Sequence, residues 1–85
     1  MRILIVEDDA RTAGFLQKGL KQAGFSVECA TDGEDGLHRL SSRSFDVAVV
    51  DLMLPKLDGL ALIGRMRAKG VETPVIILSA RSSVE

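Results

Sequence analysis

Three short runs rich in valine and isoleucine recur along the chain and constrain its fold more than any other feature. They are RILIV (residues 2–6), DVAVV (46–50) and PVIIL (74–78). Strands that are buried on both faces of a sheet read as nearly continuous apolar runs of this kind. A fourth run, FSVECA (25–30), alternates polar and apolar residues, which indicates an outer strand. The sequence therefore predicts four strands.

The segments between these runs carry apolar residues at helical spacing. We predict helices over residues 9–23, from 32 or 33 to about 41, and over 58–69, with Gly24 and Gly70 ending the first and the third. The expected inward positions are Ala13, Leu16, Leu20 and Ala23 in the first, Leu37 and Leu40 in the second, and Leu60, Leu62, Ile63 and Met66 in the third.

Strands and helices thus alternate along the whole chain. Such alternation predicts an α/β fold with a parallel sheet, right-handed crossovers and helices on both faces. We expect a flavodoxin-like, doubly wound sheet of order 2-1-3-4. The chain ends seven residues after the last predicted strand, which would leave a buried-type strand at an edge. We therefore expect residues 1–85 to be the N-terminal portion of one domain.

Composition excludes several functional classes. The net charge is −1, so no global field attracts nucleic acid or a membrane, and the absence of Trp and Tyr argues against stacking platforms for single strands. Cys29 is the only cysteine, which excludes an internal disulfide and a multi-cysteine metal site. With no run of transmembrane or signal-peptide length, we expect a cytoplasmic protein.

Acidic residues gather where two predicted inner strands end. Glu7, Asp8 and Asp9 follow the first strand, and Asp51 ends the third. Ligands of doubly wound sheets bind at the carboxyl ends of the strands, where the strand order reverses. We therefore expect Glu7, Asp8 and Asp51 at one crevice, with Ser79 on its rim, and Asp9 as the N-cap of the following helix.

Carboxylates brought together in this way repel one another and raise each other's pKa unless a cation neutralises them. An all-oxygen cluster suits Mg²⁺ first, and Mn²⁺ or Ca²⁺ next. Beside such an ion, a carboxylate can act as a nucleophile toward a phosphoryl group and form an aspartyl phosphate. A hydroxyl such as that of Ser79 can then accept the charged group by hydrogen bonding.

Three motifs, ILIVEDDA, VVDLMLPKLDG and VIILSA, resemble those of response-regulator receiver domains, the phosphoacceptor modules of two-component signalling. Together with GLKQAGFSVECATDGEDGL, the chain is most similar to OmpR-type transcription factors, including their heavy-metal-responsive branch. The resemblance implies that Asp51 is phosphorylated by a sensor histidine kinase. It also implies a Mg²⁺ site made of Asp8, Asp51, the Met53 carbonyl and, through water, Glu7.

The resemblance has further implications for signalling. Ser79 matches the switch hydroxyl, and the Ala80 amide matches a contact to the phosphate. Family members form homodimers on activation and bind DNA through a C-terminal domain that is absent here, as are the fifth strand with its lysine and the last helices. Lys56 stands where the family often has glycine, which places a cation near the rim of the site.

Two other functions remain open on the same architecture. A Mg²⁺-dependent phosphatase with an aspartate nucleophile normally needs a second acid two residues later, where this chain has Met53. A nucleotide or flavin module would need a loop rich in Gly, Ser or Thr after the first strand, whereas the sequence there is EDDAR.

Overall fold

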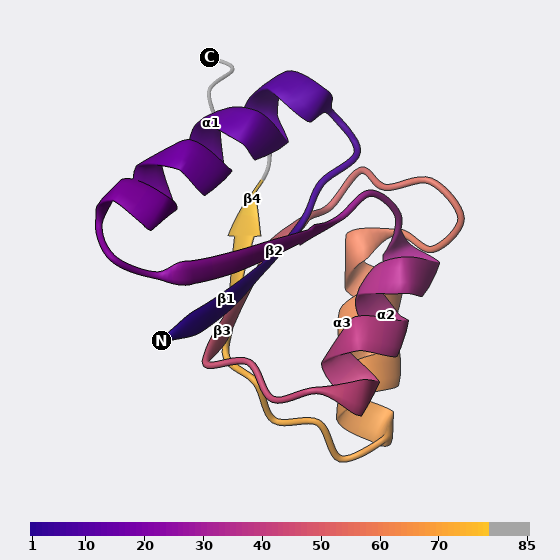
Figure 1. Ribbon diagram of the computed structural model, residues 1–85. Coiled ribbons are helices and arrows are strands. Elements are labelled where there is room, and N and C mark those ends of the chain that lie inside the picture. The colour runs from indigo at the N-terminus through magenta and orange to yellow at the C-terminus, as the bar shows by residue number, and fades with distance from the viewer. Residues whose placement is uncertain (79–85) are drawn as a thin grey trace.

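A computed structural model of the chain describes residues 1–78, in which four strands and three helices alternate (Figure 1). In chain order they are β1 (Arg2–Val6), α1 (Ala10–Gln22), β2 (Ser26–Ala30), α2 (Gly33–Ser42), β3 (Val47–Asp51), α3 (Gly59–Ala68) and β4 (Val75–Leu78). Each lies within one or two residues of the range predicted for it. No helix among residues 1–78 combines the length and the apolar content needed to cross a membrane.

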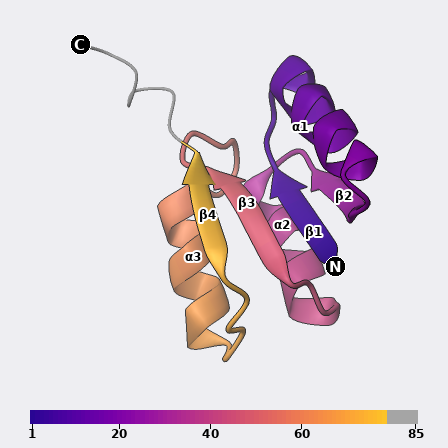
Figure 2. The same cartoon turned by 90° about the vertical axis from the view of Figure 1, so that its left-hand side faces the viewer.

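The four strands form one parallel sheet of order β2-β1-β3-β4 (Figure 2). In the register of this sheet, Val6 at the end of β1 lies opposite Ala30 of β2 and Val50 of β3. The predicted strand order and the predicted outer position of β2 are therefore confirmed. Because all strands are parallel, their carboxyl ends meet at one edge of the sheet, where the acidic residues were expected.

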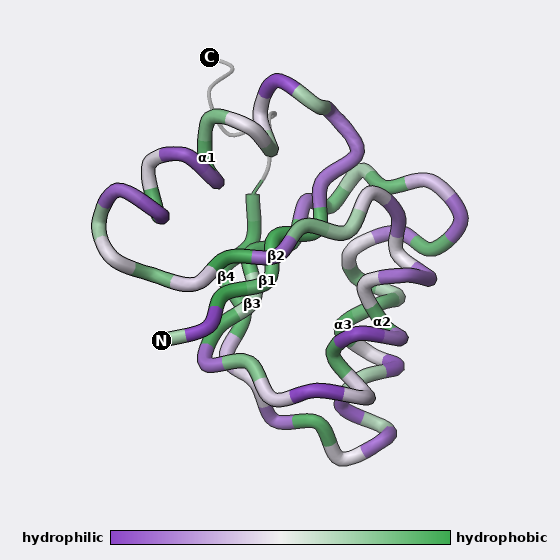
Figure 3. Tube along the Cα trace, viewed as in Figure 1, coloured by the Kyte–Doolittle hydropathy of each residue, from purple (hydrophilic) through white to green (hydrophobic). Residues whose placement is uncertain are grey.

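Helices cover both faces of the sheet, with α1 on one and α2 and α3 on the other (Figure 1). The α1 face is built from Ile3, Ile5 and Val49, against which Leu16 and Leu20 pack. The opposite face is built from Leu4, Val6, Ala48 and Val50, together with Leu40, Leu62 and Met66. Apolar residues are accordingly concentrated along the strands (Figure 3). Packing on both faces explains why β1 and β3 are continuous apolar runs.

The helix ends follow the sequence closely. Asp9, Asp32 and Asp58 are the N-caps of α1, α2 and α3, and each carboxylate accepts a hydrogen bond from the backbone amide three residues later. A cap of this type stabilises a helix by about 1 kcal/mol. Gly24 and Gly70, which follow α1 and α3, have φ values of 97° and 81°, a conformation that favours glycine. The predicted cap at Asp9 and both predicted helix ends are confirmed.

Two predicted core positions are wrong. Ala23 is exposed, because it is the C-cap residue beyond the last turn of α1 and no longer continues the buried stripe of that helix. Leu60 is 65% exposed, although it was expected in the apolar stripe of α3. The buried face of α3 is set by Leu62 and Met66, which are four residues apart and fully buried. A residue two positions before Leu62 is displaced by about 200° around the helix and points away from the sheet. Ile63, beside that face, is half-buried.

Within residues 1–78, strand β4 lies at an edge of the sheet, and its side chains Ile76 and Ile77 are 56% and 48% exposed. An open edge with apolar side chains on both faces is a template for pairing with another chain. We expect the 85-residue chain to self-associate at micromolar concentration, and Ile77→Lys to reduce this association, as measured by sedimentation velocity.

Leu60→Lys is the matched control for this prediction, because it removes an even more exposed apolar group from α3 and leaves the edge strand unchanged. A wild-type chain that stays monomeric and unfolds cooperatively with ordinary stability would contradict the prediction.

Candidate functional site

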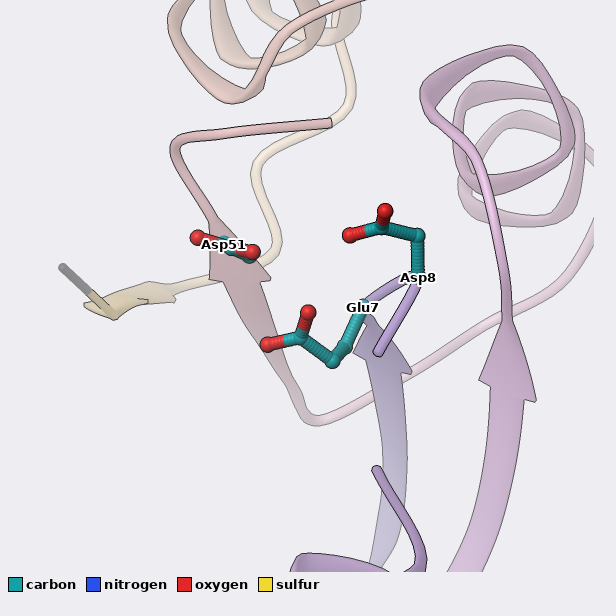
Figure 4. Close-up of side chains that lie close together, drawn as sticks. All are labelled: Glu7, Asp8 and Asp51. Atoms are coloured by element: carbon teal, nitrogen blue, oxygen red, sulfur yellow. The ribbon is translucent and has the colours of Figure 1, made fainter. Parts of the chain in front are cut away.

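Three carboxylates meet at the carboxyl edge of the sheet. Glu7 and Asp8 follow β1 directly, and Asp51 is the last residue of the neighbouring strand β3. One carboxylate oxygen of each residue lies within 4.8 Å of the corresponding oxygens of the other two. Figure 4 shows the three side chains at the ends of these two strands, around a common space. The predicted convergence of residues that are more than forty positions apart is therefore confirmed.

Backbone amides fix two of these carboxylates. The Met53 amide donates a hydrogen bond to Oδ1 of Asp51 over 3.1 Å, and the Asp9 amide donates to Oε2 of Glu7 over 3.1 Å. The group lies in a cleft of about 580 Å³ lined by Glu7, Asp8, Asp9, Thr12, Asp51, Met53 and Leu78. Asp8 is the exposed member of the three, whereas Asp51 is half-buried and Glu7 is buried.

Glu7 lies in a strongly perturbed electrostatic environment. It is only 5% exposed, and burial raises its pKa from the ordinary 4.5 to about 7. The hydrogen bond from the Asp9 amide opposes this shift, whereas a hydrogen bond to Asp51 and the charges of Asp51 and Asp8 reinforce it. Burial and, to a smaller extent, the neighbouring acids thus both disfavour the ionised form of Glu7.

The donor set fits a hard divalent cation. Glu7, Asp8 and Asp51 offer only oxygen atoms, and no histidine or cysteine joins this group among the described residues. Oxygen ligands of this kind suit Mg²⁺ and Mn²⁺. A bound cation would favour the ionised form of these carboxylates and offset their mutual repulsion. The backbone carbonyl of Met53, at the same cleft, is a further candidate oxygen ligand.

The start of α3 packs directly against the end of β3. The Gly59 amide donates a hydrogen bond to the Leu52 carbonyl over 3.1 Å. A Cβ on Gly59 would lie 2.8 Å from the Cα of Leu52 and closer still to the Asp51 carbonyl oxygen. Only glycine allows this approach, so Gly59 helps to determine where β3 ends and hence where Asp51 lies.

Two features of the site were not anticipated from the sequence. The Thr12 hydroxyl lines the cleft and donates a 2.6 Å hydrogen bond to the Asp9 carboxylate, a contact that the D-x-x-T spacing of a helix start could have indicated. Lys56 lies with its Nζ 3.7 Å from Oδ2 of Asp32, so its ion-pair partner is the N-cap of α2. Ser79 and Ala80, which were also predicted for the site, lie outside the described residues.

Comparisons with known proteins agree with this geometry. The family model described as "Response regulator receiver domain" matches residues 3–85. The transcriptional regulatory protein QseB of Haemophilus influenzae is 45% identical over 85 residues, which are 100% of this chain and 38% of QseB. The chain thus spans less than half the length of this relative.

Two solved structures share the fold over nearly the whole chain. The receiver domain of the Francisella response regulator 1452 has a TM-score of 0.91 and 36% identity, covering 98% of this chain and 69% of that structure. The receiver domain of the Pseudomonas aeruginosa sensor histidine kinase PA1611 has a TM-score of 0.91 and 28% identity, covering 98% of this chain and 70% of that structure. That structure is described with a magnesium ion coordinated in its active-site cleft. The similar relatives of this chain are OmpR-type transcriptional regulators. The family model and these relatives, which cover the whole chain, show that the chain belongs to the response-regulator receiver domains.

Proposed function

We propose that Asp51 of this receiver domain accepts a phosphoryl group from a histidine of a sensor kinase, with Mg²⁺ held by Asp8, Asp51, the Met53 carbonyl and, through water, Glu7. The observation that carries the proposal is the meeting of three carboxylates within 4.8 Å at the end of β3. Mn²⁺ satisfies the same oxygen ligands. The magnesium ion described for the PA1611 receiver domain supports this assignment.

The position of Asp51 suits a nucleophile. Its Oδ1 accepts the hydrogen bond from the Met53 amide, which leaves Oδ2 as the attacking oxygen. Oδ2 forms a bond to phosphorus while the phosphorus–nitrogen bond of the phosphohistidine breaks, and the leaving imidazole keeps that electron pair. When bound, Mg²⁺ neutralises charge on the transferring group. Because β3 is buried on both sides, the nucleophile is rigidly placed, as in-line attack requires.

Signal output belongs to the same proposal. Ser79 would supply the hydroxyl that moves toward the phosphoryl oxygens, and the Ala80 amide would contact them. Phosphorylation would favour a homodimer, and a C-terminal domain beyond residues 1–85 would bind DNA in the cytoplasm. The proposal is supported by the relative QseB, a transcriptional regulatory protein of which this chain matches 38%.

The receiver family is one of phosphoacceptor modules and not of enzymes with turnover. A phosphatase would need a second acid two residues after Asp51, and Met53 occupies that position. Many phosphate groups released from a phosphomonoester per protein chain would favour the phosphatase instead.

Phosphate transfer tests the proposed function. Incubated with a small acyl phosphate donor and Mg²⁺, the protein should gain one phosphate that is stable in acid and labile in base, as seen in the intact mass. EDTA should prevent the gain because the charge of the transferring group is then not neutralised. Asp51→Asn should lower the phosphorylated fraction to background, whereas Asp46→Asn, at the opposite end of β3, should still be phosphorylated.

Phosphate that persists in Asp51→Asn would overturn the assignment of the phosphoacceptor. Equal incorporation with EDTA and with Mg²⁺ would overturn the metal site.

A further inference from the structure

The loop between β3 and α3 contains a backbone conformation that side chains disfavour. Among residues 1–78, Lys56 is the only residue other than glycine with a positive φ, at 68°. The Leu57 amide donates a 2.7 Å hydrogen bond to the Pro55 carbonyl, so these three residues form a γ-turn with Lys56 at its centre. A γ-turn with positive φ is rare and strained. Contacts from elsewhere must therefore hold this turn closed.

The start of α2 supplies those contacts. The Gly33 amide donates a hydrogen bond to the same Pro55 carbonyl over 3.3 Å, and the Lys56 ammonium lies 3.7 Å from the carboxylate of Asp32. A Cβ on Gly33 would lie 2.6 Å from the carbonyl carbon of Leu57, so only glycine lets α2 approach the turn this closely. The turn and the first residues of α2 thus form one packed unit.

This unit adjoins the proposed metal site. The loop that contains the turn begins directly after Asp51 and includes Met53, whose amide holds the Asp51 carboxylate. Its far end is fixed by the hydrogen bond from the Gly59 amide to the Leu52 carbonyl. The γ-turn is the part of this loop that depends on contacts from another element.

Building on the proposed function, we propose that Asp32 and Lys56 are positioning residues for the site. Their ion pair keeps the γ-turn closed against α2 and thereby holds the Met53 carbonyl and Asp51 in the geometry that binds Mg²⁺. Neither residue contacts the metal or the phosphoryl group. Their effect passes through the backbone of residues 52–57.

The direction in which Lys56→Gln changes Mg²⁺ binding distinguishes a positioning role from a simple effect of charge. Lys56 is a cation close to a cation site, so its charge alone weakens Mg²⁺ binding, and its neutralisation would strengthen binding. Positioning predicts the opposite result for Lys56→Gln, namely weaker binding. Asp32→Asn removes the same ion pair but keeps a side chain that caps a helix as well as aspartate does.

Calorimetric titration with Mg²⁺ tests the proposal in the purified protein. We expect Lys56→Gln and Asp32→Asn each to weaken Mg²⁺ binding about threefold, the scale set by an exposed ion pair. The double variant should be no weaker than either single variant, because both remove one interaction. Lys56→Arg, which can keep the pair, should bind nearly as the wild type does. Lys69→Gln, which removes the same charge at the far end of α3, is the control.

Hydrogen exchange supplies a readout at the turn itself. The amides of Gly33 and Leu57, which both donate to the Pro55 carbonyl, should exchange faster in Lys56→Gln and Asp32→Asn than in Lys69→Gln. Unchanged or tighter Mg²⁺ binding in Lys56→Gln, with normal binding by the wild type, would overturn the positioning role and leave the proposed function intact. A wild-type protein that does not bind Mg²⁺ would overturn the proposed function, and the positioning role with it.

Discussion

Replacing Glu7 with glutamine should stabilise the metal-free protein by about 3 kcal/mol at pH 8. The wild-type carboxylate is buried beside Asp8 and Asp51, which raises its pKa from 4.5 to about 7. Above that pH it must carry its charge in a poorly solvated site, next to two other acids. Glutamine has nearly the same shape, carries no charge, and can still accept the hydrogen bond from the Asp9 amide.

The pH dependence of this effect follows from the direction of the pKa shift. Because the folded state holds the Glu7 proton more tightly than the unfolded chain, the wild-type stability that this proton provides is complete below about pH 4.5. It is lost as the pH rises toward 7 and is absent above that value. The free energies of unfolding of wild type and Glu7→Gln, from urea titrations in EDTA, should therefore diverge across this interval.

Mg²⁺ should make the wild type more stable than Glu7→Gln and so reverse the order of their free energies of unfolding. At alkaline pH the wild type binds the ion with ionised Glu7 and gains stability by mass action, whereas Glu7→Gln gains less. A difference in stability that does not change between acidic and alkaline pH would show that the raised pKa of Glu7 is not the cause. The matched control is Glu34→Gln, which removes an exposed acid from the first turn of α2.

Gly59→Ala should destabilise the fold by about 2–3 kcal/mol and also weaken Mg²⁺ binding about tenfold. The new Cβ would lie 2.8 Å from the Cα of Leu52 and nearer to the Asp51 carbonyl oxygen, and both of these are backbone atoms. Since backbone cannot rotate away as a flexible side chain can, either α3 or the end of β3 must shift. Because Gly59 lies against the backbone of Asp51 and Leu52, relieving the clash disturbs the position of Asp51 relative to the other two carboxylates. Chemical denaturation and Mg²⁺ titration measure the two effects.

Gly64→Ala is the control for this prediction. Gly64 lies within α3, but a Cβ there meets no atom within 4 Å. Alanine in this helix interior should stabilise the protein by about 0.5–1 kcal/mol and leave Mg²⁺ binding unchanged. Equal effects of the two substitutions would contradict the role assigned to the close contact at Gly59.

The fold could be predicted because its signals are local and repeated. The apolar runs of β1 and β3 are continuous because both faces of the sheet are covered there, and the helices between the strands require parallel pairing. The same topology brings Asp51 to Glu7 and Asp8, since parallel strands end at one edge. Repulsion between these acids was expected, and it contributes to the raised pKa of Glu7.

Other features depend on contacts that no local pattern encodes. Four apolar residues of α3 lie close together in sequence, so periodicity alone could not exclude Leu60 from the buried face. The raised pKa of Glu7 comes mainly from its burial, and burial is a property of the folded chain. The γ-turn at Lys56 is held by residues of α2 more than twenty positions away, which sequence spacing does not indicate.

Chemical trapping of the phosphorylated residue tests the central claim most directly. An aspartyl phosphate is reduced by borohydride to homoserine, which changes the mass of that one residue. Trypsin releases the peptide of residues 44–56, which contains Asp51 and also Asp46 from the opposite end of β3. With phosphodonor and Mg²⁺, fragment ions should place homoserine at residue 51 and leave Asp46 unchanged. Homoserine at Asp46, at Asp8 or nowhere in the chain would contradict the assignment of Asp51 as the phosphoacceptor.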